Sequence, residues 1–262
     1  ANTAELSAST ILSIYIESVK CFHDPSKKLD FGIVGWTLID TSTGQTTVQQ
    51  LNTPKSLQVT DDNYTKDELL RVVTGYSPRE IIVSSYDELP DNAMAFLGST
   101  INVSGWYVGD KMNQEYKKIA YQNQLFEKLF VNKINPCVSP IEHLNMEFMP
   151  GSVISYVSLV QYIYEHDPKL MNQIQEPSIW EDSQHLVLEN NCIEQLDIIN
   201  KKANRYGSLF NMINFTSTVN GKRLLNSRLL SPSVDLETLQ TRYDTTYNLN
   251  NANGSIEKLD VL

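Results

Sequence analysis

The chain has 262 residues, of which 41% are hydrophobic and 20% are charged, a composition that excludes a wholly disordered or fibrous protein. Its length suits two domains of ordinary size. The formal net charge of −10 divides into −6 over residues 1–150 (12 basic, 18 acidic) and −4 over residues 151–262 (9 basic, 13 acidic), so neither half is a basic body that seeks nucleic-acid phosphates.

The sequence carries no sign of a membrane span or a secretory signal. No apolar run approaches the roughly 18 residues that cross a bilayer, and no basic segment precedes an apolar one at the N-terminus. Cys21, Cys137 and Cys192 are odd in number and widely spaced, which discourages both a disulfide framework and a zinc site. We therefore expect an intracellular protein with reduced thiols and no membrane partner.

The first part of the chain predicts strands joined by turns. Residues 11–22 and 31–40 are β-rich runs on either side of a turn-forming stretch, which predicts neighbouring antiparallel strands. The stretch 40–45, DTSTGQ, predicts a tight turn in which Gly44 can adopt a positive φ, and a third strand follows at 46–51. This pattern is a β-meander.

A helix and further strands are predicted after the meander. Asp61 or Asp62 can cap a helix that runs to about Val73. Residues 78–86 form a short apolar run typical of a strand buried on both faces, and residues 101–108 predict another strand. The order of these elements predicts an α/β module with one mixed sheet and flanking helices.

The later part of the chain predicts helices. Ser139 and Glu142 have the capping-box spacing, with a proline in the first helical position, and so predict a helix start. Residues 153–164 are apolar on nearly every side, which predicts an enclosed helix. Three further helices are predicted, at 208–215, at 221–230 and from about Asp235.

These patterns divide the chain into two modules. We assign residues 1–135 to the α/β domain and residues 136–262 to a helical domain, with the polar, proline-punctuated stretch 165–182 as the best candidate for a join. Residues 255–262 continue a helix-compatible pattern with no stop signal, so we expect the helical domain to be truncated at its C-terminal end.

Motifs for catalysis or cofactor binding are not found. Gly221 and Lys222 are the only candidates for a phosphate-binding loop, but Thr216 and Arg223 stand where a glycine and a hydroxyl are needed. The histidines have no metal-ligand spacing, and no Gly-x-Ser-x-Gly elbow occurs. We predict no catalytic, cofactor-binding or metal-binding residue in this chain.

Asp40 allows two interpretations. As a carboxylate at the end of a strand, it could help to hold magnesium ions in a nuclease of the RNase H type. It could also start the following turn by accepting hydrogen bonds from its own backbone. We favour the turn, because the strand at 78–86 offers no further acid before Asp87.

Residues 186–243 carry a more specific signal. The stretch 216–230, TSTVNGKRLLNSRLL, is followed by Pro232 and Arg242, and it resembles the core or lever segment of the MutS family of DNA mismatch-repair proteins. The family pattern Thr-x-x-Gly-x-Arg-Leu-Leu is matched from Thr218 onward. The matching residues are Gly221, Arg223, Leu224, Leu225, Pro232 and Arg242. They indicate packing and capping, with Gly221 allowing a close helix approach and the two leucines buried.

The resemblance implies a fold and a set of partners. Residues 34–44, VGWTLIDTSTG, are similar to a strand and turn of the family's connector domain, which is an RNase H-like module. The family places a mismatch-reading module before this region, and a clamp and an ATPase after it. A parent protein of this kind would bind ATP and magnesium, mismatched double-stranded DNA and a second MutS-type subunit. A downstream repair protein could dock on the connector.

Three hypotheses follow. The leading one is a non-catalytic connector and lever that couple mismatch binding to a remote ATPase. The alternatives are an active RNase H-like nuclease with a helical appendage, and a protein-docking scaffold.

Overall fold

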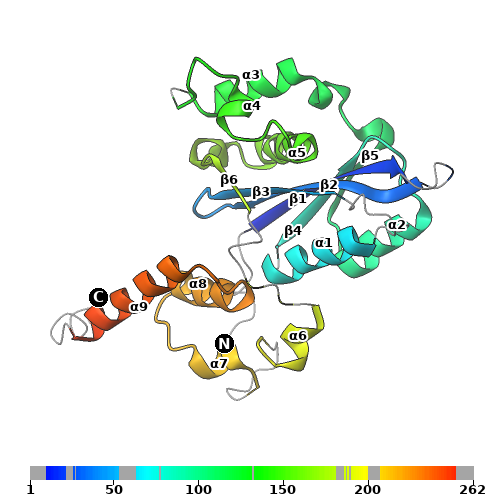
Figure 1. The fold of residues 1–262 in the computed structure, drawn as a ribbon. Helices are drawn as coiled ribbons and strands as arrows, with labels where there is room; N and C mark the ends of the chain where they lie inside the picture. The colour runs from blue at the N-terminus through cyan, green and yellow to red at the C-terminus, as the bar shows by residue number, and fades with distance from the viewer. Residues whose placement is uncertain are drawn as a thin grey trace. The chain divides into compact units, whose positions relative to one another are not determined.

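The fold comes from a computed structural model that describes residues 10–21, 26, 28–52, 63–76, 78–131, 133–180, 186, 188, 190–199 and 207–251. The chain divides into two compact units, the first ending at Trp180 and the second beginning at Glu181. The first unit contains the sheet, and the described elements of the second are helices (Figure 1).

A mixed sheet forms the centre of the first unit. The strands are β1 (Thr10–Lys20), β2 (Lys28–Asp40), β3 (Thr46–Asn52), β4 (Glu80–Ser85), β5 (Gly105–Val108) and β6 (Pro177–Ile179). Their order across the sheet is β5-β4-β1-β2-β3-β6. Strands β1, β2 and β3 pair antiparallel, which confirms the predicted meander. Strand β4 runs parallel to β1, β5 parallel to β4, and β6 parallel to β3.

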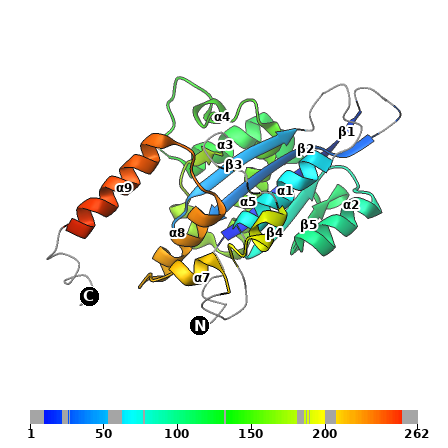
Figure 2. The same ribbon diagram turned by 60° about the horizontal axis from the view of Figure 1, so that its bottom comes forward.

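Helices cover both faces of this sheet (Figures 1 and 2). On one face lie α1 (Asn63–Tyr76), α2 (Asp91–Ala95) and the π-helical turn η2 (Phe96–Ile101). On the other lie α3 (Ile119–Leu129), α4 (Pro140–His143) and α5 (Pro150–His166). Short 3-10 turns complete the unit: η3 (Gly109–Lys111), η4 (Gln114–Lys117) and η5 (Pro168–Gln173).

Alternation along β1 produces the two hydrophobic cores. Leu12, Ile14 and Ile16 pack with the core on the α1 face, whereas Tyr15 packs with the core on the α5 face. Successive side chains of a strand point to opposite faces, so a strand covered on both sides must be apolar at nearly every position. The same reasoning predicted β4, whose residues 81–85 are all buried.

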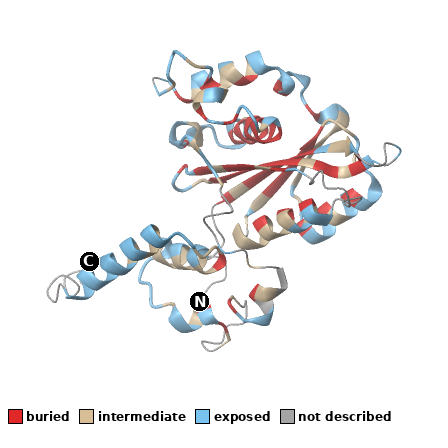
Figure 3. Ribbon diagram, in the orientation of Figure 1, coloured by how far each residue is buried: buried red, intermediate tan, exposed pale blue. Residues whose placement is uncertain are grey.

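Helix α5 is the enclosed helix that its sequence predicts. All ten residues from Gly151 to Val160 are buried, as the red helix in Figure 3 shows. Its small residues bring it close to the sheet, since Ser155 Oγ donates to the carbonyl of Ser13 at 2.9 Å and Ser152 Oγ donates to the carbonyl of Gln49 at 2.6 Å. These bonds satisfy helix hydroxyls that would otherwise be buried without partners.

The packing of α5 places the domain boundary later in the chain than the sequence predicted. The predicted division between residues 135 and 136 would assign α5 to a helical domain, yet this helix packs on β1 and β2 of the sheet. The two units instead separate after Trp180. This point lies inside the polar stretch 165–182 that the sequence offered as a join.

One predicted strand is shorter than expected. The run 101–108 begins with the end of η2, and Asn102 then adopts the left-handed conformation with φ of 62°. A strand cannot continue through a residue with a left-handed backbone conformation, so β5 begins only at Gly105.

The second unit consists of short and medium helices in its described part. They are α6 (Asn190–Gln195), α7 (Leu209–Ile213), α8 (Val219–Leu230) and α9 (Leu236–Asn251). Ile193, Ile198 and Leu230 form a small buried cluster, with Leu188, Ile199 and Leu229 packed against it. The predicted helices at 208–215, 221–230 and from Asp235 correspond to α7, α8 and α9. The pattern at 255–262 and the caps at Asp61 and Asp62 lie outside the described residues.

Candidate functional site

Asp40 builds a turn at the end of β2. Its Oδ1 accepts the backbone N–H of Ser42 at 2.8 Å and the hydroxyl of Ser42 at 2.6 Å. Its carbonyl accepts the N–H of Gly44 at 2.7 Å, and Gly44 has φ of 75°. A side chain that accepts from the backbone two residues onward is the turn chemistry expected of aspartate.

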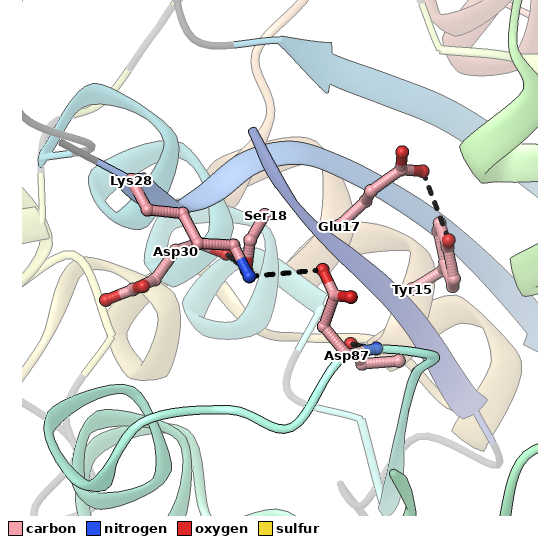
Figure 4. A network of polar contacts seen from close by, with 7 residues as sticks. Tyr15, Glu17, Ser18, Lys28, Asp30 and Asp87 are labelled. Atoms are coloured by element: carbon pink, nitrogen blue, oxygen red, sulfur yellow. Dashed lines mark hydrogen bonds and ion pairs between the residues drawn. The ribbon is translucent and has the colours of Figure 1, made fainter. Parts of the chain in front are cut away.

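A separate polar network lies around β1, β2 and the segment that follows β4 (Figure 4). Lys28 Nζ is 3.5 Å from Asp87 Oδ2, and the Tyr15 hydroxyl donates to Glu17 Oε2 at 3.1 Å. Burial, followed by the charge of Glu17, raises the pKa of the Tyr15 phenol well above its ordinary value of 10.0. The Lys28 ammonium beside Asp87 also opposes the approach of a metal cation by charge repulsion.

Asp40 and Asp87 lie at opposite ends of the sheet. Asp40 pairs with Thr10 at the start of β1. Asp87 follows β4, and because β4 runs parallel to β1, this residue lies beyond the level at which Ser84 pairs with Tyr15. Asp40 therefore cannot join Asp87 in one metal site. In the part of the chain that the structure describes, no three His, Cys, Asp or Glu residues form a metal-binding group.

Sequence reasoning did not single out the network of Lys28 and Glu17. Residues 23–30 were assigned to a turn, whereas β2 already begins at Lys28. The signal was present in the alternation of Lys28 and Asp30 with the buried Leu29 and Phe31.

The family motif lies on α8 and forms its N-terminal cap. The Thr218 side chain accepts the backbone N–H of Gly221 at 3.0 Å. A Cβ atom on Gly221 would lie 3.1 Å from Thr218 Oγ1 and 3.5 Å from Thr216 Cβ. The glycine therefore leaves room for its own cap, and the close helix approach expected from the sequence stays a prediction.

The burial predicted for the motif leucines is only partly observed. Leu224 is 51% exposed and Leu225 is half-buried, while Leu230 at the end of α8 is the buried residue. The small cluster of the second unit explains this, because it reaches only the last turn of α8. Arg223 is half-buried on the same helix.

Pro232 and Arg242 lie after the cap motif, in the turn before α9 and within α9. The Pro232 carbonyl accepts the N–H of Leu186 at 2.8 Å, and the Arg242 carbonyl accepts the hydroxyl of Thr246 at 2.8 Å. No residue of α9 is buried within the described chain, and Leu236 and Tyr243 are exposed. Gly221 thus takes part in the cap of α8, and Pro232 and Arg242 accept hydrogen bonds through their backbone carbonyls.

Comparisons with known proteins place these elements in a family. The family model described as MutS domain III matches residues 191–260, which include α7 to α9 and all but the first residue of α6. A DNA mismatch repair protein mutS homolog of Acanthamoeba polyphaga mimivirus is 28% identical over 249 residues, covering 86% of this chain and 22% of its own length. Residues 191–260 thus match a MutS domain, and most of the chain is similar to MutS mismatch repair proteins.

Two further MutS relatives cover different shares of the chain. The mitochondrial DNA mismatch repair protein mutS homolog of Sarcophyton glaucum is 31% identical over 52% of this chain and 13% of its own length. DNA mismatch repair protein MutS of Caldanaerobacter subterraneus subsp. tengcongensis is 27% identical over 72% of this chain and 21% of its own length. The chain thus spans about a quarter or less of the MutS relatives that it matches. Its described helices include none that is both long and apolar enough to cross a membrane.

Proposed function

We propose that this chain forms the connector and the first part of the lever of a MutS-type mismatch-recognition ATPase. Its function is mechanical: the first unit joins the DNA-reading part to the lever, and the lever transmits the bound state toward the ATPase. The observation that carries this proposal is that the domain III match, residues 191–260, falls on the second unit, which begins at Glu181.

The first unit supports the connector assignment. We infer an RNase H-like module from the antiparallel meander β1-β2-β3 followed by β4 and β5, which extend the sheet beside β1 in parallel. The turn at Asp40 and the Lys28–Asp87 pair are consistent with a module of this kind that serves as a structural body.

The partners and cofactors of the proposal follow from the similarity to MutS proteins. The complete protein would bind mismatched double-stranded DNA and a second MutS-type subunit, and its ATPase would use ATP and magnesium. A downstream repair protein could dock on the connector. None of the residues of this chain is assigned a catalytic role in the proposal.

Coupling between two distant ligand sites requires parts of the protein that move as rigid bodies. A sheet covered on both faces resists deformation, because close-packed interiors repack between discrete arrangements and do not bend continuously. Helices such as α9 transmit displacement along their length when their backbone bonds are intact. Two ligands that favour different arrangements of such bodies are coupled by a free energy.

The isolated 262-residue chain provides a direct test. We expect it to fold, to release no phosphate from ATP with magnesium, and to bind a mismatched duplex no more tightly than a matched one in a gel-shift titration. ATP turnover that copurifies with the chain, or tight discrimination of the mismatch, would contradict the proposal.

A further inference from the structure

A pocket of about 390 Å³ lies between α5 and the segment that runs from β5 to α3. This volume is within the range of roughly 300 to 1,000 Å³ that is usual for small-molecule sites. All of its lining residues belong to the first unit, and its tyrosines pack against the core on the α5 face of the sheet. The role proposed above does not use it.

Four tyrosines line this pocket. They are Tyr107, Tyr116, Tyr121 and Tyr162. The rings of Tyr116 and Tyr121 stack with centroids 5.7 Å apart, and the Tyr162 hydroxyl donates to Glu80 Oε2 at 2.9 Å. Stacking holds the rings of Tyr116 and Tyr121, and the hydrogen bond to Glu80 holds Tyr162. Aromatic rings carry partial negative charge on their faces, so a set of rings around one space attracts a cation.

A carboxylate contributes negative charge to the same space. Glu165 lines the pocket, and its Oε1 accepts the side-chain amide of Gln161 at 2.9 Å. Burial, and then the charges of neighbouring groups that include Glu165, raise the pKa of Tyr116 to about 12. Glu165 also raises the pKa of Tyr107, after burial. The field of this carboxylate therefore reaches the phenols.

A buried hydroxyl lies in the wall without a partner. Ser158 is 7% exposed, it lines the pocket, and its Oγ has no hydrogen-bond partner among the described residues. A buried polar group without a partner costs free energy, which a ligand that supplies one recovers. The Ser158 oxygen can accept an N–H from a bound group.

We propose that this pocket binds a guanidinium group on an aliphatic chain, as in arginine. The planar cation can stack on tyrosine rings, pair with Glu165 and donate to Ser158 Oγ, and the volume leaves space for the methylene chain. Lys111 is the one cation among the lining residues, and it lies on the exposed turn η3. The Lys111 ammonium competes with the cationic ligand for the pocket. Removal of its charge should therefore tighten binding. The proposal goes beyond the coupling function and does not depend on it.

Calorimetric titration of the 262-residue chain with N-acetyl-L-arginine amide tests this inference. We expect saturable binding that the uncharged analogue N-acetyl-L-norleucine amide does not show. Equal binding of both compounds, or none of either, would overturn the proposal. Comparison of free L-arginine with a Gly-Gly-Arg-Gly-Gly peptide distinguishes the sources: tighter binding of the amino acid indicates a free metabolite, and tighter binding of the peptide indicates the side chain of a partner protein.

Three substitutions locate the site. Glu165→Gln should weaken binding about tenfold or more, because it removes a charge-assisted contact, and its exposed position should leave the fold intact. Lys111→Gln should tighten binding. Glu127→Gln, on an exposed position of α3 outside the pocket, is the matched control and should leave the dissociation constant unchanged. A folded Glu165→Gln variant that binds as well as the unmodified chain would exclude the pocket.

Discussion

Gly35 of β2 and Gly151 of α5 allow a helix backbone to approach a strand backbone. A Cβ atom on Gly35 would overlap the carbonyl carbon of Gly151, and the N–H of Gly151 donates to Gln50 Oε1 at 2.8 Å. This approach lets Ser152 and Ser155 reach carbonyls of β3 and β1. At the scale of single residues, two glycines determine how closely the helix packs on the sheet.

Gly35→Ala should destabilise the first unit by about 3 kcal/mol, because the backbone atoms that it would meet cannot rotate away as a side chain can. The matched control is Gly75→Ala on α1, where an added Cβ meets nothing within 4 Å. This second change should be neutral or stabilise by up to about 1 kcal/mol. Urea unfolding followed by tryptophan fluorescence measures both. Equal stability of the two variants would contradict the close approach.

Asp235 gives the start of α9 a defined pH dependence. Hydrogen bonds from the side chain and the backbone N–H of Thr238 hold the pKa of Asp235 below its ordinary value of 3.8. A carboxylate with a lowered pKa contributes stability above its unfolded pKa and loses it as the pH falls through the folded pKa. We expect helix content to fall in this acidic range, and Asp235→Asn to remove that part of the change. Circular dichroism of both proteins between pH 5 and about pH 2 measures the difference, and identical curves would argue against the cap.

At the scale of elements, periodicity predicted most of the strands and helices. The meander, β4 and α5 follow from local pattern, because a doubly covered strand and an enclosed helix must both be apolar on nearly every side. The end of η2 was missed, since the left-handed Asn102 stops a run whose residues otherwise favour a strand. The backbone conformation of Asn102 therefore determined where η2 ends.

Burial in the second unit could not be predicted from spacing alone. Leu224 and Leu236 have the periodicity of a core face, yet both are exposed in the described chain. Periodicity reports which side of a helix is apolar, whereas burial depends on whether another element covers that side. The domain boundary was misplaced for a related reason, because the sequence of α5 does not state whether a helix or a sheet encloses it.

The Asp40 turn and the tyrosine pocket also differ in how well the sequence predicts them. The Asp40 turn could be predicted, because its bonds join residues two to four positions apart. The tyrosine pocket could not, since it brings together Tyr107, Tyr121 and Glu165 from β5, α3 and α5. Contacts between distant parts of the chain depend on the topology of the sheet and its helices, which local patterns do not encode.

At the scale of the whole molecule, the proposed coupling depends on α9 acting as a rigid helix. Thr241 lies inside this helix, and its hydroxyl donates to the carbonyl of Glu237 at 2.9 Å. Thr241→Pro would break the backbone ladder there, at a cost of about 3 kcal/mol to the helix. Thr241→Ala keeps the ladder and is the matched control.

The most direct measurement is the mismatch-stimulated ATPase rate of the full-length gene product that carries this chain. We expect Thr241→Pro to abolish the stimulation by mismatched DNA and to leave the basal ATPase rate unchanged, while Thr241→Ala retains both. Full stimulation in a folded Thr241→Pro protein would contradict the proposal that this chain transmits the signal.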